Sequence, residues 1–129
     1  MIDCDISKWP IVKMHFGSSP SYKDVLNWLD KCSQILKKQQ KFLVISTFSE
    51  QYQFEHKARL KQAKWFKESK PELAKWCLGM IRVTNDPIMI KKINAPAMAK
   101  GMPFSCIAVG NTCSAWEKAQ QILIEDNLI

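Results

Sequence analysis

The sequence predicts an α/β domain that spans residues 1–129, with about five strands in a mostly parallel sheet and helices packed on it. A length of 129 residues fits one core better than two. Hydrophobic residues make up 47% of the chain, enough to fill such a core. The hydrophobic period changes repeatedly between short apolar runs and helical stripes, in the order β-β-α-β-α-β-α-β-α.

The first third of the chain predicts a hairpin and an amphipathic helix. Strands are expected at residues 2–6 and 11–16, close enough in sequence to pair as a hairpin. A helix of about 19 residues follows, with Ser21 as its N-cap and Asp24 in its first turn. The apolar run 41–48 is typical of a strand that is buried on both faces of a parallel sheet.

The middle of the chain predicts a helix over residues 55–69. Pro71 either breaks this helix or opens a second short one, residues 72–78, because proline has no backbone N–H to donate. Gly79 is placed as a helix stop, and residues 80–84 form the next strand.

The last third predicts a short helix at residues 88–93, preceded by Asp86 as a turn or cap. The last strand is expected at residues 103–109, and Thr112 or Ser114 caps a final helix. The central strand is either 42–48 or 104–109. Core positions are expected at Phe42, Val44, Ile45, Ile81, Val83, Ile107 and Val109.

A leading hairpin followed by αβ units resembles, in element order, the STAS-like fold of anti-sigma-factor antagonists and SpoIIAA-like proteins. In the antagonists, a phosphorylatable serine lies in an Asp-Ser-Ser-Gly loop at a helix start, after a central strand. The matching place here, residues 46–51, reads Ser-Thr-Phe-Ser-Glu-Gln and lacks that motif. The resemblance therefore implies a fold for most of the chain and no phospho-switch.

Several classes of site are disfavoured by residue counts and spacing. The chain has only four glycines, and no two lie within five residues, so neither nucleotide-binding glycine motif is present and no cofactor is expected. The five cysteines include no Cys-x-x-Cys pair, which disfavours a disulfide framework and a zinc ribbon. His15 and His56 are the only histidines, and no metal site is expected.

A cytoplasmic location with reduced thiols is predicted. The N-terminus carries acids where a secretory signal needs basic and then apolar residues. No apolar stretch approaches the roughly 20 residues of a transmembrane helix.

Four residues are candidates for catalysis: Glu50, Arg82, Asp86 and Cys113. Glu50 and Asp86 follow predicted strand ends, where functional groups of parallel sheets gather. Cys113 lies near the start of the last helix and is the best-placed nucleophile. Three of them also have a structural explanation: a cap for Asp86, a salt bridge for Arg82 and an unpartnered thiol for Cys113. An enzyme requires these groups to converge in one pocket.

Residues 56–75 hold seven basic residues against two acids and supply +5 of the net charge of +7. Four lysines cluster on or beside one helical face: Lys57, Lys61, Lys64 and Lys67. A solvated face is the first interpretation. Binding of a polyanion, either nucleic acid or an anionic membrane, is the alternative.

Five tryptophans are present, and tryptophan favours interfaces and pockets over complete burial. We therefore interpret the chain as an interaction or ligand-binding module with a protein or small-molecule partner. One form of such a module is a homodimer that assembles through a tryptophan-bearing helix surface. A small enzyme with a polar site at the strand ends and the polyanion binder stay open as alternatives.

Overall fold

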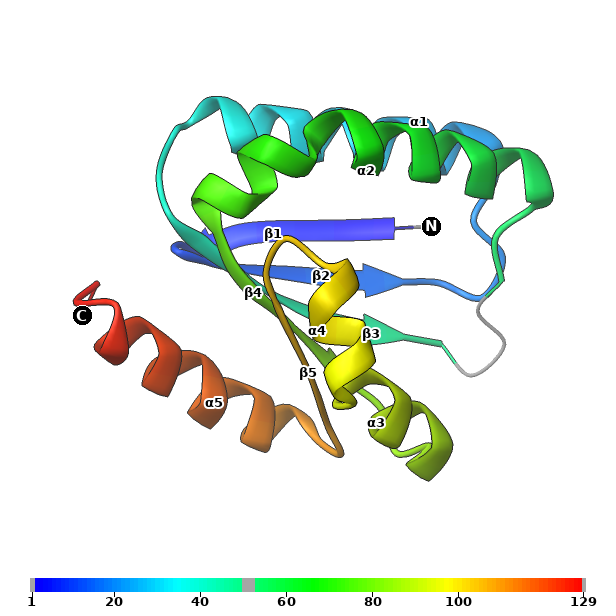
Figure 1. Cartoon of the computed structure of the whole chain (residues 1–129). Coiled ribbons are helices and arrows are strands. Elements are labelled where there is room, and N and C mark those ends of the chain that lie inside the picture. Colours follow the sequence, from blue (N-terminus) through cyan, green and yellow to red (C-terminus); the bar gives the residue numbers. More distant parts are fainter. Residues whose placement is uncertain (1, 50–52, 129) are drawn as a thin grey trace.

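A computed structural model of the chain describes residues 2–49 and 53–128 (Figure 1). Helices and strands alternate along it as β1 (Ile2–Lys8), β2 (Ile11–Phe16), α1 (Tyr22–Lys37), β3 (Phe42–Phe48), α2 (His56–Trp76), β4 (Cys77–Val83), α3 (Pro87–Ile93), α4 (Pro96–Gly101), β5 (Ser105–Val109) and α5 (Thr112–Glu125). This order contains one more helix than the sequence predicts, because α4 forms where the pattern of residues 97–101 is ambiguous.

The five strands form one sheet in the order β1-β2-β3-β4-β5. β1 pairs antiparallel with β2, and every other pair is parallel. The predicted α/β class, the N-terminal hairpin and the mostly parallel sheet are therefore confirmed. β3 lies at the centre, as one of the two predicted alternatives has it. The other alternative is wrong, because β5 is an edge strand.

Helices cover both faces of the sheet (Figure 1). α1 and α2 lie on one face, where Val12, Val44 and Leu29 belong to one buried cluster. α5 lies on the opposite face, where Leu43 and Ile81 belong to the other. Successive side chains of a strand point to opposite faces, so β3 supplies both clusters from neighbouring positions.

The predicted core positions on β3 and at Ile81 are buried. Three others are only partly buried and pack against the cluster under α5: Val83, Ile107 and Val109. Two of these lie on β5, which has a neighbouring strand on one side only. The edge position explains why apolar strand residues stay partly exposed there.

The prediction for residues 55–79 is wrong in two respects. α2 continues through Pro71 to Trp76, and Gly79 lies inside β4 rather than at a helix stop. Pro71 is exposed, on the side of α2 opposite buried Leu73, so the backbone hydrogen bond that proline cannot make is lost on the solvent-facing side of the helix. At Gly79, a Cβ atom would lie 3.1 Å from the backbone oxygen of Ser105. The glycine therefore accommodates close packing of strands rather than a helix end.

Helix capping follows the sequence at α1 and departs from it at α5. Ser21 caps α1, with its hydroxyl accepting from the Asp24 N–H and the Asp24 carboxylate accepting from the Ser21 N–H, each at 3.0 Å. For α5, the cap is Asn111 rather than Thr112 or Ser114. The Asn111 side-chain oxygen accepts from the Ser114 N–H at 2.8 Å. Asparagine is among the strongest N-cap residues, which accounts for the one-residue shift from Thr112.

Within the described ranges, the helices all lack the combination of length and apolar character that crossing a bilayer requires.

Candidate functional site

Arg82, the first of the catalytic candidates, lies near the carboxyl end of β4. Its guanidinium carbon lies 4.0 Å from the centroid of the Phe48 ring, a cation–π contact. Phe48 packs against the cluster under α1 and α2, so Arg82 projects from that face of the sheet. The contact gives this arginine a structural role at the end of two adjacent strands.

The other candidates that the structure describes, Asp86 and Cys113, do not join Arg82 in one pocket. The Asp86 carboxylate accepts from the Ile88 N–H at 3.0 Å and caps α3, as the structural interpretation predicts. Cys113 is exposed in the first turn of α5, on the opposite face of the sheet from Arg82. Glu50 lies outside the described residues. The described catalytic candidates therefore form no common site.

The predicted lysine face lies along α2. Its four members are Lys57, Lys61, Lys64 and Lys67. The Lys57 ammonium lies 4.5 Å from the Tyr22 ring centroid, over α1. Lys61 and Lys64 border a hollow of about 270 Å³ together with two acids, Asp30 and Glu68. Acidic groups thus interrupt the positive surface on the side where α2 meets α1.

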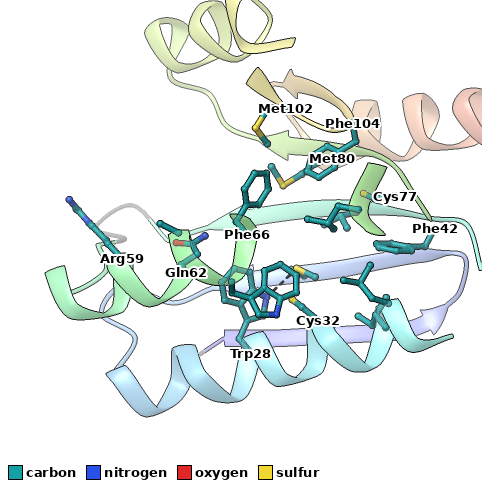
Figure 2. Close-up of a pocket in the computed structure, with 17 residues that line it drawn as sticks. Trp28, Cys32, Phe42, Arg59, Gln62, Phe66, Cys77, Met80, Met102 and Phe104 are labelled. Atoms are coloured by element: carbon teal, nitrogen blue, oxygen red, sulfur yellow. Dashed lines mark hydrogen bonds between the residues drawn. The ribbon is translucent and has the colours of Figure 1, made fainter. Parts of the chain in front are cut away.

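A larger cavity of about 470 Å³ lies between the sheet and the two helices α1 and α2 (Figure 2). The figure draws the 17 residues that line it. They are Met14, Trp28, Cys32, Ile35, Leu36, Phe42, Val44, Arg59, Gln62, Ala63, Trp65, Phe66, Leu73, Cys77, Met80, Met102 and Phe104. None of the described catalytic candidates and none of the four predicted lysines belongs to this set.

The floor of the cavity follows from strand alternation. Met14 on β2, Val44 on β3 and Met80 on β4 all project from the face covered by α1 and α2. Methionine is unbranched and flexible, so it fills a cavity lining without fixing its shape. On α2, the small side chain of Ala63 leaves space at the cavity edge.

Specific contacts hold the cavity walls. Phe66 of α2 meets Phe104, just before β5, edge to face with ring centroids 6.4 Å apart. The Trp28 indole N–H donates to the Met14 sulfur at 3.4 Å. These contacts connect both helices to the sheet around the cavity. Packing therefore positions the parts of the lining that belong to α1, to α2 and to the sheet.

The thiols in the lining behave as apolar groups. Burial raises the pKa of Cys77 to about 12, and burial likewise raises the pKa of Cys32. Both thiols are therefore neutral at physiological pH. All five cysteines are unpaired in the structure. The described lining is consequently neutral and apolar except at Arg59 and Gln62. Both residues lie on α2, about one helical turn apart.

All five tryptophans are half-buried. Trp28 and Trp65 line the cavity, which agrees with the expectation that one or two tryptophans border a pocket or an interface. Phe42 and Val44 were expected as core positions, and the sequence marked none of the other lining residues as part of a pocket. The sequence signal for the cavity floor was methionine or valine on the same face of three adjacent strands. This signal can be recognised only when the strand register is known.

Metal binding has no visible basis in the part of the chain that the structure describes, where no three potential ligands cluster. The His15 Nδ1 atom lies 2.7 Å from the Thr47 hydroxyl, a cross-strand hydrogen bond on the sheet surface. His56 is exposed at the start of α2.

The comparisons with known proteins give no relative to reason from. No protein-family model, no curated protein and no solved structure matches this chain. The function must therefore be inferred from the cavity and from the residues around it.

Proposed function

We propose that the chain is a single α/β domain that binds a small apolar molecule in the cavity between the sheet and the helices α1 and α2. The observation that carries this proposal is a space of about 470 Å³ whose 17 described lining residues include two with polar side chains, Arg59 and Gln62. Pockets for small molecules occupy roughly 300–1,000 Å³ and are mostly apolar with a few polar groups.

Burial energetics favour an apolar occupant of the cavity. A hydrocarbon placed against this lining makes dispersion contacts with it. It also removes its own apolar surface from water, at roughly 25 cal/mol per Å².

The fold family, the location and the alternative functions have separate grounds. Sheet order β1-β2-β3-β4-β5 with one antiparallel edge strand supports a STAS-like fold, in keeping with the element order. The cytoplasmic location and the homodimer stay predictions from the sequence.

For the polyanion alternative, the support is the four lysines of α2. Asp30 and Glu68 beside them weaken that support. For an enzyme, support would require convergence of the catalytic candidates.

The test compares binding of an uncharged fluorescent naphthylamine probe to three proteins. Ala63→Trp places a large ring at the cavity edge, while Ala74→Trp places the same ring on α2 away from the cavity. Both alanines are exposed, so both variants are expected to fold. We expect Ala63→Trp to weaken probe binding about tenfold, or roughly 1.4 kcal/mol, and Ala74→Trp to leave it unchanged.

Native mass spectrometry of protein isolated from its host adds a direct search for a retained ligand. Equal probe affinities for Ala63→Trp and Ala74→Trp would place the probe elsewhere and remove the basis of the proposal. Absence of probe binding to the unmodified protein would have the same consequence.

A further inference from the structure

The cavity has a polar end and an apolar end. Figure 2 shows Arg59 and Gln62 together on one side, whereas Phe42 and Cys77 lie on the other, with Phe66 and Trp28 between them. Arg59 is exposed and Gln62 is half-buried, while Phe42 and Cys77 are buried. The polar pair therefore marks the mouth, and the apolar side chains enclose the interior.

The hydrogen-bonding groups at this mouth are available to a ligand. Among the described residues, neither the Arg59 guanidinium nor the Gln62 amide group of the side chain has a hydrogen-bond or ion-pair partner. The guanidinium group carries five N–H donors in a planar arrangement, and the glutamine amide adds two more. Figure 2 shows the Arg59 guanidinium directed outward from the cavity, where it can meet a head group that stays near solvent.

Charge favours an anionic head group at this position. Arg59 is the one charged residue in the described lining, and its charge is positive. The planar guanidinium matches a carboxylate by two parallel hydrogen bonds, a geometry that an ammonium group does not provide. A single arginine beside a neutral amide fits a single negative charge.

The volume accommodates one hydrocarbon chain of medium length. A space of about 470 Å³ lies within the range of roughly 300–1,000 Å³ that small-molecule pockets occupy.

We propose, on the basis of the function proposed above, that the ligand is a medium-chain fatty acid whose carboxylate binds Arg59 and Gln62. Its hydrocarbon chain runs along Phe66 and Trp28 toward Phe42. The arginine determines the preference for an acid over an uncharged chain of equal length.

The experiment measures binding of dodecanoate and dodecanol to the full chain, below their aggregation limits, by calorimetry and by quenching of tryptophan fluorescence. The variants are Arg59→Gln and, as a control for loss of one positive charge, Lys64→Gln. Lys64 lies on the same helix but does not line the cavity. Circular dichroism verifies that both variants fold.

We expect dodecanoate to bind the unmodified protein about tenfold more tightly than dodecanol, since charge-assisted hydrogen bonds add to the same apolar contact. Arg59→Gln should abolish this preference by weakening dodecanoate alone, and Lys64→Gln should preserve it. The preference should also decrease as salt is raised, because the arginine is exposed.

Two outcomes separate the two proposals. Equal affinity of dodecanoate and dodecanol, or equal loss of both in Arg59→Gln, would overturn the assignment of the carboxylate site and leave the apolar cavity as the binding site. Absence of binding by either compound would overturn both proposals.

Discussion

The indole N–H of Trp65 on α2 donates to the hydroxyl of Ser33 on α1, with 2.8 Å between nitrogen and oxygen. Trp65 also lines the cavity, so this bond connects the two covering helices beside the proposed ligand. Tryptophan combines a large apolar body with one donor, and that donor usually needs a partner when the ring is buried.

Replacing Ser33 by alanine should lower the free energy of unfolding by about 1 kcal/mol, because the half-buried indole N–H loses its acceptor. Asn27→Ala, at an exposed position of the same helix, is the matched control and should change stability by less than about 0.5 kcal/mol. Urea unfolding measures both. Equal effects of the two substitutions would show that the Trp65–Ser33 bond contributes nothing.

Asn94, which follows α3, pairs with the free edge of β5. Its side-chain oxygen accepts from the Ala108 N–H at 2.9 Å, and its amide group donates to the Ala108 oxygen at 3.3 Å. Unpaired strand edges are templates for association, so this side chain shields part of the edge. Asn94→Ala should reduce stability by about 1–2 kcal/mol and increase aggregation, measured by urea unfolding and light scattering. Asn85→Ala, at an exposed position before α3, should do neither.

Local sequence patterns predict the parts of this fold that depend on neighbours in the chain. Ser21 and Asp24 identify the start of α1 because both capping bonds join residues three apart. The apolar run of β3 predicts a strand buried on both faces, and both of its faces are covered. Gly79 misleads because its reason for being glycine is Ser105 on a neighbouring strand, 26 positions away (105 − 79).

The cavity could not be predicted from the same patterns. It depends on which strand faces share a layer and on the distance of α2 from the sheet, neither of which periodicity reports. Apolar residues that surround a cavity also look identical in sequence to residues that fill a core. Arg59 was counted only as part of a basic segment, since its position at the cavity mouth needs the tertiary arrangement.

Gly79 and Gly101 should respond in opposite directions to alanine. At Gly79, the added Cβ would lie 3.1 Å from a backbone oxygen of the adjacent strand, so β4 and β5 must separate slightly. At Gly101, nothing lies within 4 Å of the added atom. We expect Gly79→Ala to lower the thermal midpoint and Gly101→Ala to raise stability by about 0.4–1 kcal/mol, since alanine restricts the unfolded chain. A stabilised Gly79→Ala protein would contradict the packing role of this glycine.

Asp24 should make stability depend on pH in the acid range. The Ser21 backbone N–H, together with the Ser21 hydroxyl, holds the pKa of the Asp24 carboxyl below its ordinary value of 3.8. The unfolded chain therefore binds a proton at this site before the folded protein does. The contribution is present above pH 3.8 and is lost as pH falls through the lower folded value. Asp24→Asn should flatten this part of the stability profile, measured by urea unfolding from pH 5 to pH 2.5. If the stability of Asp24→Asn fell between pH 5 and pH 2.5 as steeply as that of the unmodified protein, this assignment would be wrong.

The cysteines provide an internal measure of cavity occupancy. Cys113 is exposed, whereas Cys32 and Cys77 are buried in the cavity lining. Because the thiolate is the reactive form and burial raises the pKa of Cys77 to about 12, this thiol should react slowly at neutral pH. A bulky, charged thiol reagent should therefore modify Cys113 promptly, and Cys32 and Cys77 only on unfolding.

A small uncharged methanethiosulfonate can enter an apolar cavity and extends the same measurement to the ligand. Dodecanoate should slow its reaction with Cys32 and Cys77 while leaving the rate at Cys113 unchanged, because a chain in the cavity covers both lining thiols but reaches no part of α5. Peptide mass spectrometry after timed quenching resolves the three sites, and Ala63→Trp should show the slowing without ligand. If dodecanoate slowed all three cysteines equally, a global effect on stability would explain the result. If it slowed none, the chain would have to bind outside this cavity.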